Sequence, residues 1–211
     1  LQPKQKGQLQ LIKTPYLNTE YLGINLRFGT EKDNPLLIKK VRQALNYGFD
    51  RDLMLRSLRN SMGKPATSGF APRGLPSFNE KIIGYNYNIE KARALLREAG
   101  FPDGKNMPPI KIFVIKDYLD ICTFIAKQWE SLGVKTNVEV IESATLAEKM
   151  TSGTVPFFRG SWIADYPDAE SYYTVFYSKN PAPPNYTRFQ NSFYDRLYEK
   201  VVAEKNDSIR Y

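Results

Sequence analysis

The chain has 211 residues, 42% of them hydrophobic and 25% charged, with a net charge of +8, no histidine and one cysteine. The lack of histidine excludes Ser-His and Cys-His nucleophilic pairs and histidine metal sites, and the lone Cys122 excludes an internal disulfide and a thiolate zinc cluster. The positive charges are dispersed along expected helices without an RNP-type motif or a recognition helix, so we expect no nucleic-acid binding.

Strands and helices are predicted to alternate in the first part of the chain. Residues 21–26 are expected to form a strand. Asn34 and Pro35 are typical of the N-cap and first position of a helix, and a second, shorter helix is predicted to start at Asp50. The Gly- and Pro-rich segment 63–78 breaks regular structure and predicts a long loop.

The alternation continues through the middle of the chain. Asn88 can cap a helix that ends at Gly100, where glycine tolerates the left-handed conformation. Residues 110–115 predict a strand, and apolar residues then recur at helical spacing through the segment 118–133. Residues 134–140 alternate between apolar and polar side chains, as in a strand with unequal faces. We expect the helical stripe to pack in the core.

The last part of the chain contains shorter elements. The predicted elements are a helix from Ser143 or Thr145 to Met150, a strand from Val155 toward Trp162, a helix at 169–177, an extended link at 181–184 and an amphipathic helix at 193–205. The alternation of strands and helices along the whole chain predicts an α/β fold.

One segment, RGSWIADYPD from Arg159 to Asp168, lies at the end of the last predicted strand. Asp165 comes after an apolar run and before Tyr166, and the proline that follows lacks the N–H that a continuing strand would need. Ligands of open α/β sheets usually bind beyond the carboxyl ends of strands. Two roles are open: Asp165 and Asp168 can bond nearby backbone N–H groups in a turn, or Asp165 binds a cation, such as a ligand ammonium, beside Trp162 and Tyr166.

Three segments carry a resemblance to a known family. They are VRQALNYGFDR at 41–51, YNYNIEKARALLREAGFPDG at 85–104 and SWIADYPD at 161–168. In this order they resemble the signature segments of the oligopeptide- and dipeptide-binding proteins of ABC importers, the bacterial extracellular solute-binding proteins of family 5. The resemblance implies one lobe of a type II periplasmic-binding-protein-like fold, with a mixed β-sheet flanked by helices, at residues 21–211. Residues 1–20 are then expected to be a lead-in from the missing part of the protein.

The resemblance also implies a function. A two-lobed protein of this kind captures a short peptide and delivers it to a membrane permease, without enzymatic activity, cofactor or metal. It works in a periplasm or elsewhere outside the cytoplasmic membrane, free or tethered by a lipid at a removed amino terminus. Because the second lobe is missing here, we expect the fragment alone to bind peptide poorly.

The resemblance assigns roles to residues of the SWIADYPD segment and its surroundings. Asp165 is expected to bind the α-ammonium of the peptide, with Trp162 and Tyr166 beside it. Arg159 is expected to help hold the peptide carboxylate, because it stands six residues before Asp165 as in some peptide-binding members. Arg159 can equally be a surface ion-pair residue, since strand register decides where its side chain points.

Three alternatives to a peptide-binding lobe remain open from the sequence. The same scaffold can carry a sugar, an opine or a metal chelate, although the lack of histidine disfavours direct metal recognition. A carboxylate-pair hydrolase could use Asp165 with Asp168 or Glu170, which are close in sequence. The third alternative is a structural module whose partner is the permease.

Overall fold

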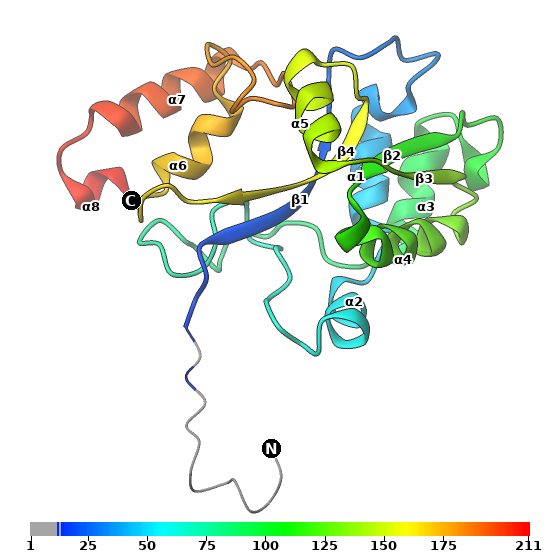
Figure 1. Ribbon diagram of the computed structural model, residues 1–211, viewed down its shortest axis with the longest axis horizontal. Helices are drawn as coiled ribbons and strands as arrows, with labels where there is room; N and C mark the ends of the chain where they lie inside the picture. The colour runs from blue at the N-terminus through cyan, green and yellow to red at the C-terminus, as the bar shows by residue number, and fades with distance from the viewer. Residues whose placement is uncertain (1–11, 13) are drawn as a thin grey trace, which may run out of the picture.

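The computed structural model describes residue 12 and residues 14–211. Its four strands form one mixed sheet in the order β1-β4-β2-β3. The strands are β1 (Asn18–Ile24), β2 (Ile110–Val114), β3 (Thr136–Val140) and β4 (Phe157–Ile163). β1 is antiparallel to β4, whereas β2 is parallel to both β3 and β4. Helices flank both faces of this sheet (Figure 1), which confirms the α/β class with a mixed sheet.

β1 is displaced toward the amino end relative to its predicted range of 21–26. It starts at Asn18, where the ladder with β4 begins at Ile163. It ends at Ile24, because the Leu26 amide leaves the sheet and donates to the Thr187 carbonyl at 2.9 Å. The division of the chain into a lead-in at 1–20 and a lobe at 21–211 stays a prediction, and most of the lead-in, residues 1–11 and 13, lies outside the described residues.

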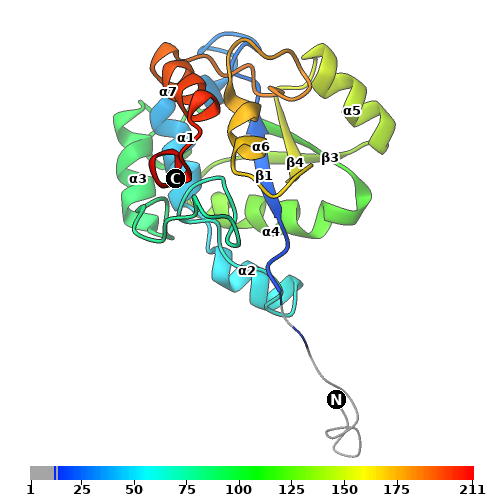
Figure 2. The same cartoon turned by 90° about the vertical axis from the view of Figure 1, so that its left-hand side faces the viewer.

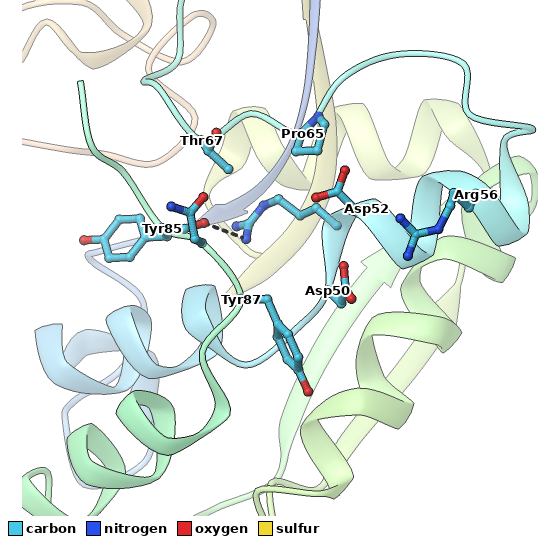
Figure 3. A pocket seen from close by; sticks show the side chains of 9 residues that line it. Asp50, Asp52, Arg56, Pro65, Thr67, Tyr85 and Tyr87 are labelled. Carbon is cyan, nitrogen blue, oxygen red and sulfur yellow. Dashed lines mark hydrogen bonds between the residues drawn. The ribbon is translucent and has the colours of Figure 1, made fainter. Parts of the chain in front are cut away.

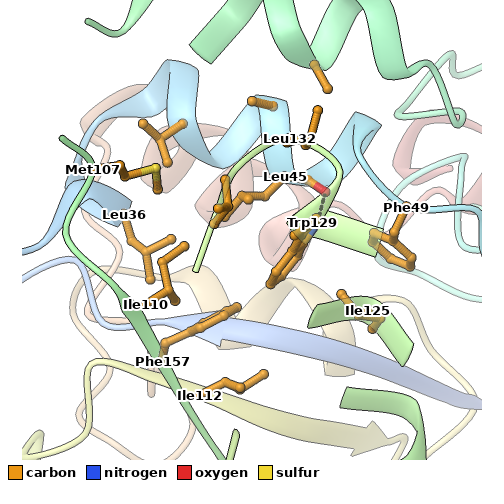
Figure 4. Packing of buried hydrophobic residues seen from close by; sticks show 14 of the residues in the cluster. Leu36, Leu45, Phe49, Met107, Ile110, Ile112, Ile125, Trp129, Leu132 and Phe157 are labelled. Atoms are coloured by element: carbon orange, nitrogen blue, oxygen red, sulfur yellow. Dashed lines mark hydrogen bonds between the residues drawn. The ribbon is translucent and has the colours of Figure 1, made fainter. Parts of the chain in front are cut away.

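The main core lies between one face of the sheet and the helices α1 (Lys39–Tyr47), α3 (Ile89–Glu98) and α4 (Leu119–Glu130). Trp129 of α4 stacks on Phe157 of β4 with 6.2 Å between ring centroids (Figure 4). Its indole N–H donates to the Leu45 carbonyl at 3.0 Å, so this large buried side chain has no unsatisfied polar group. The apolar stripe in segment 118–133 is therefore core, as predicted.

The helix predicted to start at Asn34 and Pro35 is two elements. Asn34 caps a 3₁₀ turn, Pro35–Leu37, and α1 begins only after Ile38, whose backbone is extended. The Arg42 guanidinium donates to the Leu36 and Leu37 carbonyls at 2.8 and 2.7 Å, which satisfies the backbone groups exposed by the break. The next helix, α2 (Arg51–Leu58), starts where predicted, and its N-cap carboxylate accepts from the Leu53 amide at 2.9 Å.

Asn88 caps α3 as predicted, since its side chain accepts from the Lys91 amide at 2.9 Å. Replacing Asn88 by alanine is expected to lower the free energy of unfolding by about 1 kcal/mol, because this amide loses its acceptor. Urea denaturation measures the change, with Asn86→Ala as the control because Asn86 is exposed and precedes the helix. Equal losses in both variants would contradict the capping role.

α5 (Ser143–Ser152) covers the opposite face of the sheet and ends at Gly153, whose φ is +77°. Figure 2 shows the strands between α1 and α3 on one side and α5 on the other. A second core forms here from Leu146, Met150, Val155 and Phe158. None of the helices in the described residues is both long enough and apolar enough to span a membrane.

The last helices gather at the β1 and β4 end of the sheet (Figure 1). They are α6 (Glu170–Tyr173), followed by a 3₁₀ turn at Thr174–Phe176, and then α7 (Ser192–Ala203) and α8 (Asp207–Arg210). The link predicted as extended at 181–184 is instead a turn, in which the Asn185 amide donates to the Pro181 carbonyl at 3.0 Å. The buried Asn185 side chain holds this turn in place by donating to the Tyr177 and Phe189 carbonyls at 3.2 and 2.9 Å.

Candidate ligand-binding site

The predicted site residues lie where β4 runs beyond its neighbour β2. The last β2 partner of β4 is Phe113, which pairs with Phe158, and β2 ends one residue later at Val114. β4 continues to Ile163, and beyond Phe158 it pairs only with β1 among the described residues. One edge of this part of β4 therefore has no strand beside it in the part of the chain that the structure describes.

Arg159 points to the face of the sheet that carries α4. Its side chain is only 9% exposed, forms an ion pair with Glu20 of β1, and lies 3.0 Å from the centroid of the Tyr118 ring. Burial lowers the pKa of Arg159 to about 10. The guanidinium thus belongs to an ion pair, as the sequence left open, in which Arg159 is buried and Glu20 is exposed. A ligand carboxylate would have to compete with Glu20, and the role of Arg159 in holding one stays a prediction.

Trp162 lies on the opposite face of β4 from Arg159. It is half-buried and packs with Ala169 and Tyr172. Its indole N–H donates to the Ser171 carbonyl at 2.5 Å. Trp162 therefore connects the end of β4 to α6.

Asp165 and Tyr166 are both exposed in the loop after β4. The Asp165 amide donates to the Ser171 hydroxyl at 3.3 Å, whereas its carboxylate has no hydrogen bond or ion pair within the described ranges 12 and 14–211. The Tyr166 hydroxyl donates to Glu170, and this bond to a carboxylate raises the pKa of Tyr166. Trp162, Asp165 and Tyr166 thus lie around the end of β4, whereas the Arg159 side chain lies on the other face of that strand.

Asp168 has the turn role that the sequence left open for both carboxylates. One of its oxygens accepts from the Glu170 amide at 2.8 Å, and the other accepts from the Tyr211 hydroxyl at 2.9 Å and pairs with Arg210 at 2.7 Å. Burial opposes ionisation of Asp168, but these partners outweigh it, so its pKa lies below the ordinary value. Of the two carboxylates, only that of Asp165 is available to a ligand in the described part of the chain.

A separate hollow of about 430 Å³ opens at the start of α2 (Figure 3). It is lined by Asp50, Asp52, Arg56, Pro65, Thr67, Tyr85 and Tyr87, among others. This hollow was not predicted from the sequence, because it forms only where the start of α2, the loop at 65–67 and the segment 85–87 come together in the fold. Both signs of charge line its wall, so its residues favour no one class of ligand.

The Arg51 side chain connects two of the three segments on which the family resemblance rests. Its guanidinium donates to the Asn46 and Tyr85 carbonyls at 3.0 and 3.2 Å and lies 4.1 Å from the centroid of the Phe49 ring. Burial lowers its pKa to about 10. Arg51 therefore holds segment 85–104 against segment 41–51, which gives these two family-like segments a structural role.

Comparison with known proteins gives consistent matches along the chain. The model of the family described as bacterial extracellular solute-binding proteins, family 5 Middle, matches residues 1–184. The heme-binding protein A of Haemophilus influenzae is 30% identical over 98% of this chain and 38% of its own length. The dipeptide-binding protein of Escherichia coli is 26% identical over 98% of this chain and 39% of its own length.

A solved structure gives the same picture. The periplasmic oligopeptide-binding protein of Borrelia burgdorferi superposes with a TM-score of 0.82 at 26% identity, covering 92% of this chain and 38% of that one. The chain therefore spans about two fifths of the length of these relatives.

Proposed function

The chain belongs to the bacterial extracellular solute-binding proteins of family 5, whose members bind solutes rather than catalyse reactions, and on that premise we propose that it is the peptide-anchoring lobe of an ABC importer's binding protein. The protein captures a short peptide with a free amino terminus between this lobe and a second one, and delivers it to a permease. It acts outside the cytoplasmic membrane, in a periplasm or an equivalent compartment.

The Asp165 carboxylate, which has no partner in the part of the chain that the structure describes, is the observation that carries this proposal. It lies just past the part of β4 that lacks a neighbour on one edge in the described residues. An extended peptide can add its backbone to such an edge, and its amino-terminal ammonium then meets a carboxylate that has no other partner among the described residues. Such a site does not need to distinguish the side chains of the peptide, because it recognises the peptide backbone and the charged amino terminus.

The charge of Asp165 also favours a peptide over the other cargo named among the relatives. One relative is named as a heme-binding protein and another as a dipeptide-binding protein. Heme carries two anionic propionates, which an unpartnered carboxylate would repel, whereas a peptide offers a cation to the same place. In this proposal Trp162 and Tyr166 flank the ammonium, and Arg159 serves the peptide carboxylate if the ligand displaces Glu20.

Calorimetry on the full-length protein tests the ligand class. Tri-alanine is expected to bind at least about 30-fold more tightly than its N-acetylated form, because acetylation removes the charge that pairs with Asp165. Hemin is the comparison ligand. Tri-alanine amide, which lacks the carboxylate, measures separately how much the carboxyl terminus of the peptide contributes to affinity. Equal affinity for the free and acetylated peptides, or tight binding of hemin alone, would overturn the proposal.

A further inference from the structure

The loop that presents Asp165 is held by residues much later in the chain. We call residues 164–168 the anchor loop. Its backbone makes four hydrogen bonds. The Ala164 amide donates to the Leu17 carbonyl at 3.0 Å, the Asp165 amide to the Ser171 hydroxyl at 3.3 Å, and the Asp168 amide to the Tyr166 carbonyl at 2.8 Å, while the Asp168 carbonyl accepts from the Ser171 amide at 3.2 Å. None of these bonds involves the Asp165 carboxylate, which lies on an exposed part of the loop.

Arg210 of α8 and the following Tyr211 contact one side of the anchor loop. Arg210 of α8 pairs with Asp168 at 2.7 Å, and both side chains are only 19% exposed. The Tyr211 hydroxyl donates to the same Asp168 oxygen at 2.9 Å. Because the other Asp168 oxygen caps the Glu170 amide, this single carboxylate connects α8 with the start of α6. In Figure 1 the end of the chain lies beside the end of β4.

α7 holds the loop from a second direction. The Glu170 carboxylate accepts from two tyrosine hydroxyls, that of Tyr166 in the anchor loop and that of Tyr198 in α7. The Tyr198 side chain is half-buried, so its bond to Glu170 is only partly exposed to water. Glu170 therefore couples the position of Tyr166, next to Asp165, to the position of α7.

We propose that Arg210 and Tyr198 are positioning residues for ammonium recognition: through Asp168 and Glu170 they hold the anchor loop so that the Asp165 carboxylate faces the ligand. This inference rests on the proposed function, in which the Asp165 carboxylate of the anchor loop binds the ammonium of a peptide. An ion pair between a ligand and a fixed group depends on its geometry, and a supporting group that sets that geometry contributes to affinity without touching the ligand.

The test compares free and N-acetylated tri-alanine on the full-length protein, since their affinity ratio reports on the ammonium contact alone. Arg210→Gln is expected to lower this ratio about three- to tenfold, and Tyr198→Phe about two- to threefold. Arg210→Lys should retain most of the ratio because it keeps the charge opposite Asp168. Arg196→Gln in α7 is the matched control, since Arg196 is exposed and lies against the Phe193 ring, 5.9 Å from its centroid.

A second measurement follows the loop without any ligand. Hydrogen exchange of the Asp165 and Asp168 amides is expected to speed up in Arg210→Gln and to stay unchanged in Arg196→Gln. Unchanged exchange, or an equal loss of affinity for both peptides, would reduce Arg210 to a structural residue and overturn the inference. Asp165→Asn separates the two proposals: a ratio that survives this change overturns the proposed function, whereas a ratio lost there but kept in Arg210→Gln overturns only the positioning role.

Discussion

Alanine at position 133 is expected to lower the free energy of unfolding by about 3–5 kcal/mol, a large effect for a single added methyl group. Gly133 has a φ of +78°, and a Cβ built there would lie 1.9 Å from the Asp103 carbonyl oxygen. The clash is with backbone, so no rotamer change relieves it. The neighbours Leu132 and Val134 are fully buried, so a shift of the backbone would also disturb the main core.

Gly100 offers a matched control for the backbone part of this effect. Its φ is +89°, but a Cβ there would meet nothing within 4 Å. Gly100→Ala should therefore cost only the left-handed conformation, about 1–2 kcal/mol. Chemical denaturation of both variants separates strain from the clash, and the melting temperature of Gly133→Ala should fall by about 10 °C. Similar losses in the two variants would show that the close approach to Asp103 is unimportant.

Elements whose signals are local could be predicted from the sequence. Asn88 and Asp50 cap the next helix with their own side chains, and each bond spans three residues. The break at Ile38 could not be predicted, because it depends on the Arg42 side chain satisfying the freed carbonyls after folding. The turn at 181–184 likewise depends on a buried asparagine that binds carbonyls on both sides. These side-chain bonds span four to eight residues and, unlike a helix cap, have no fixed spacing that marks them in the sequence.

The same distinction applies to the candidate site. Pro167 marked the end of β4 and thus the place of Asp165, because a missing N–H is a local property. The partner of Arg159 is Glu20, which lies 139 residues away in the chain. The Asp168 carboxylate differs from that of Asp165 because it accepts a hydrogen bond from Tyr211, 43 residues later in the chain. Residue types and spacing therefore indicated which side chains could bind a ligand. Only the fold showed that the Asp168 carboxylate is bonded to other residues and that the Asp165 carboxylate has no partner among the described residues.

Replacing Asp165 by asparagine is expected to weaken binding of free-amine peptides by about 30- to 1,000-fold, or about 2–4 kcal/mol. Asparagine keeps nearly the same size and can still accept a hydrogen bond, so the loss measures the charge. Fold stability should change little, because the Asp165 side chain is exposed and its carboxylate bonds no other residue in the described part of the chain. Calorimetry on the full-length protein gives the affinity, and the melting temperature confirms that the variant folds.

Asp52→Asn is the control that tests the competing location. Asp52 is exposed and lines the hollow at the start of α2, away from the end of β4. If ammonium recognition takes place at Asp165, this change leaves the affinity for tri-alanine within about twofold, as expected of a surface charge remote from the ligand. If peptide affinity instead collapses in Asp52→Asn and survives in Asp165→Asn, the ligand binds in the hollow beside α2. The charge requirement would then belong to the α2 amino terminus, and the free carboxylate after β4 would have no part in capture.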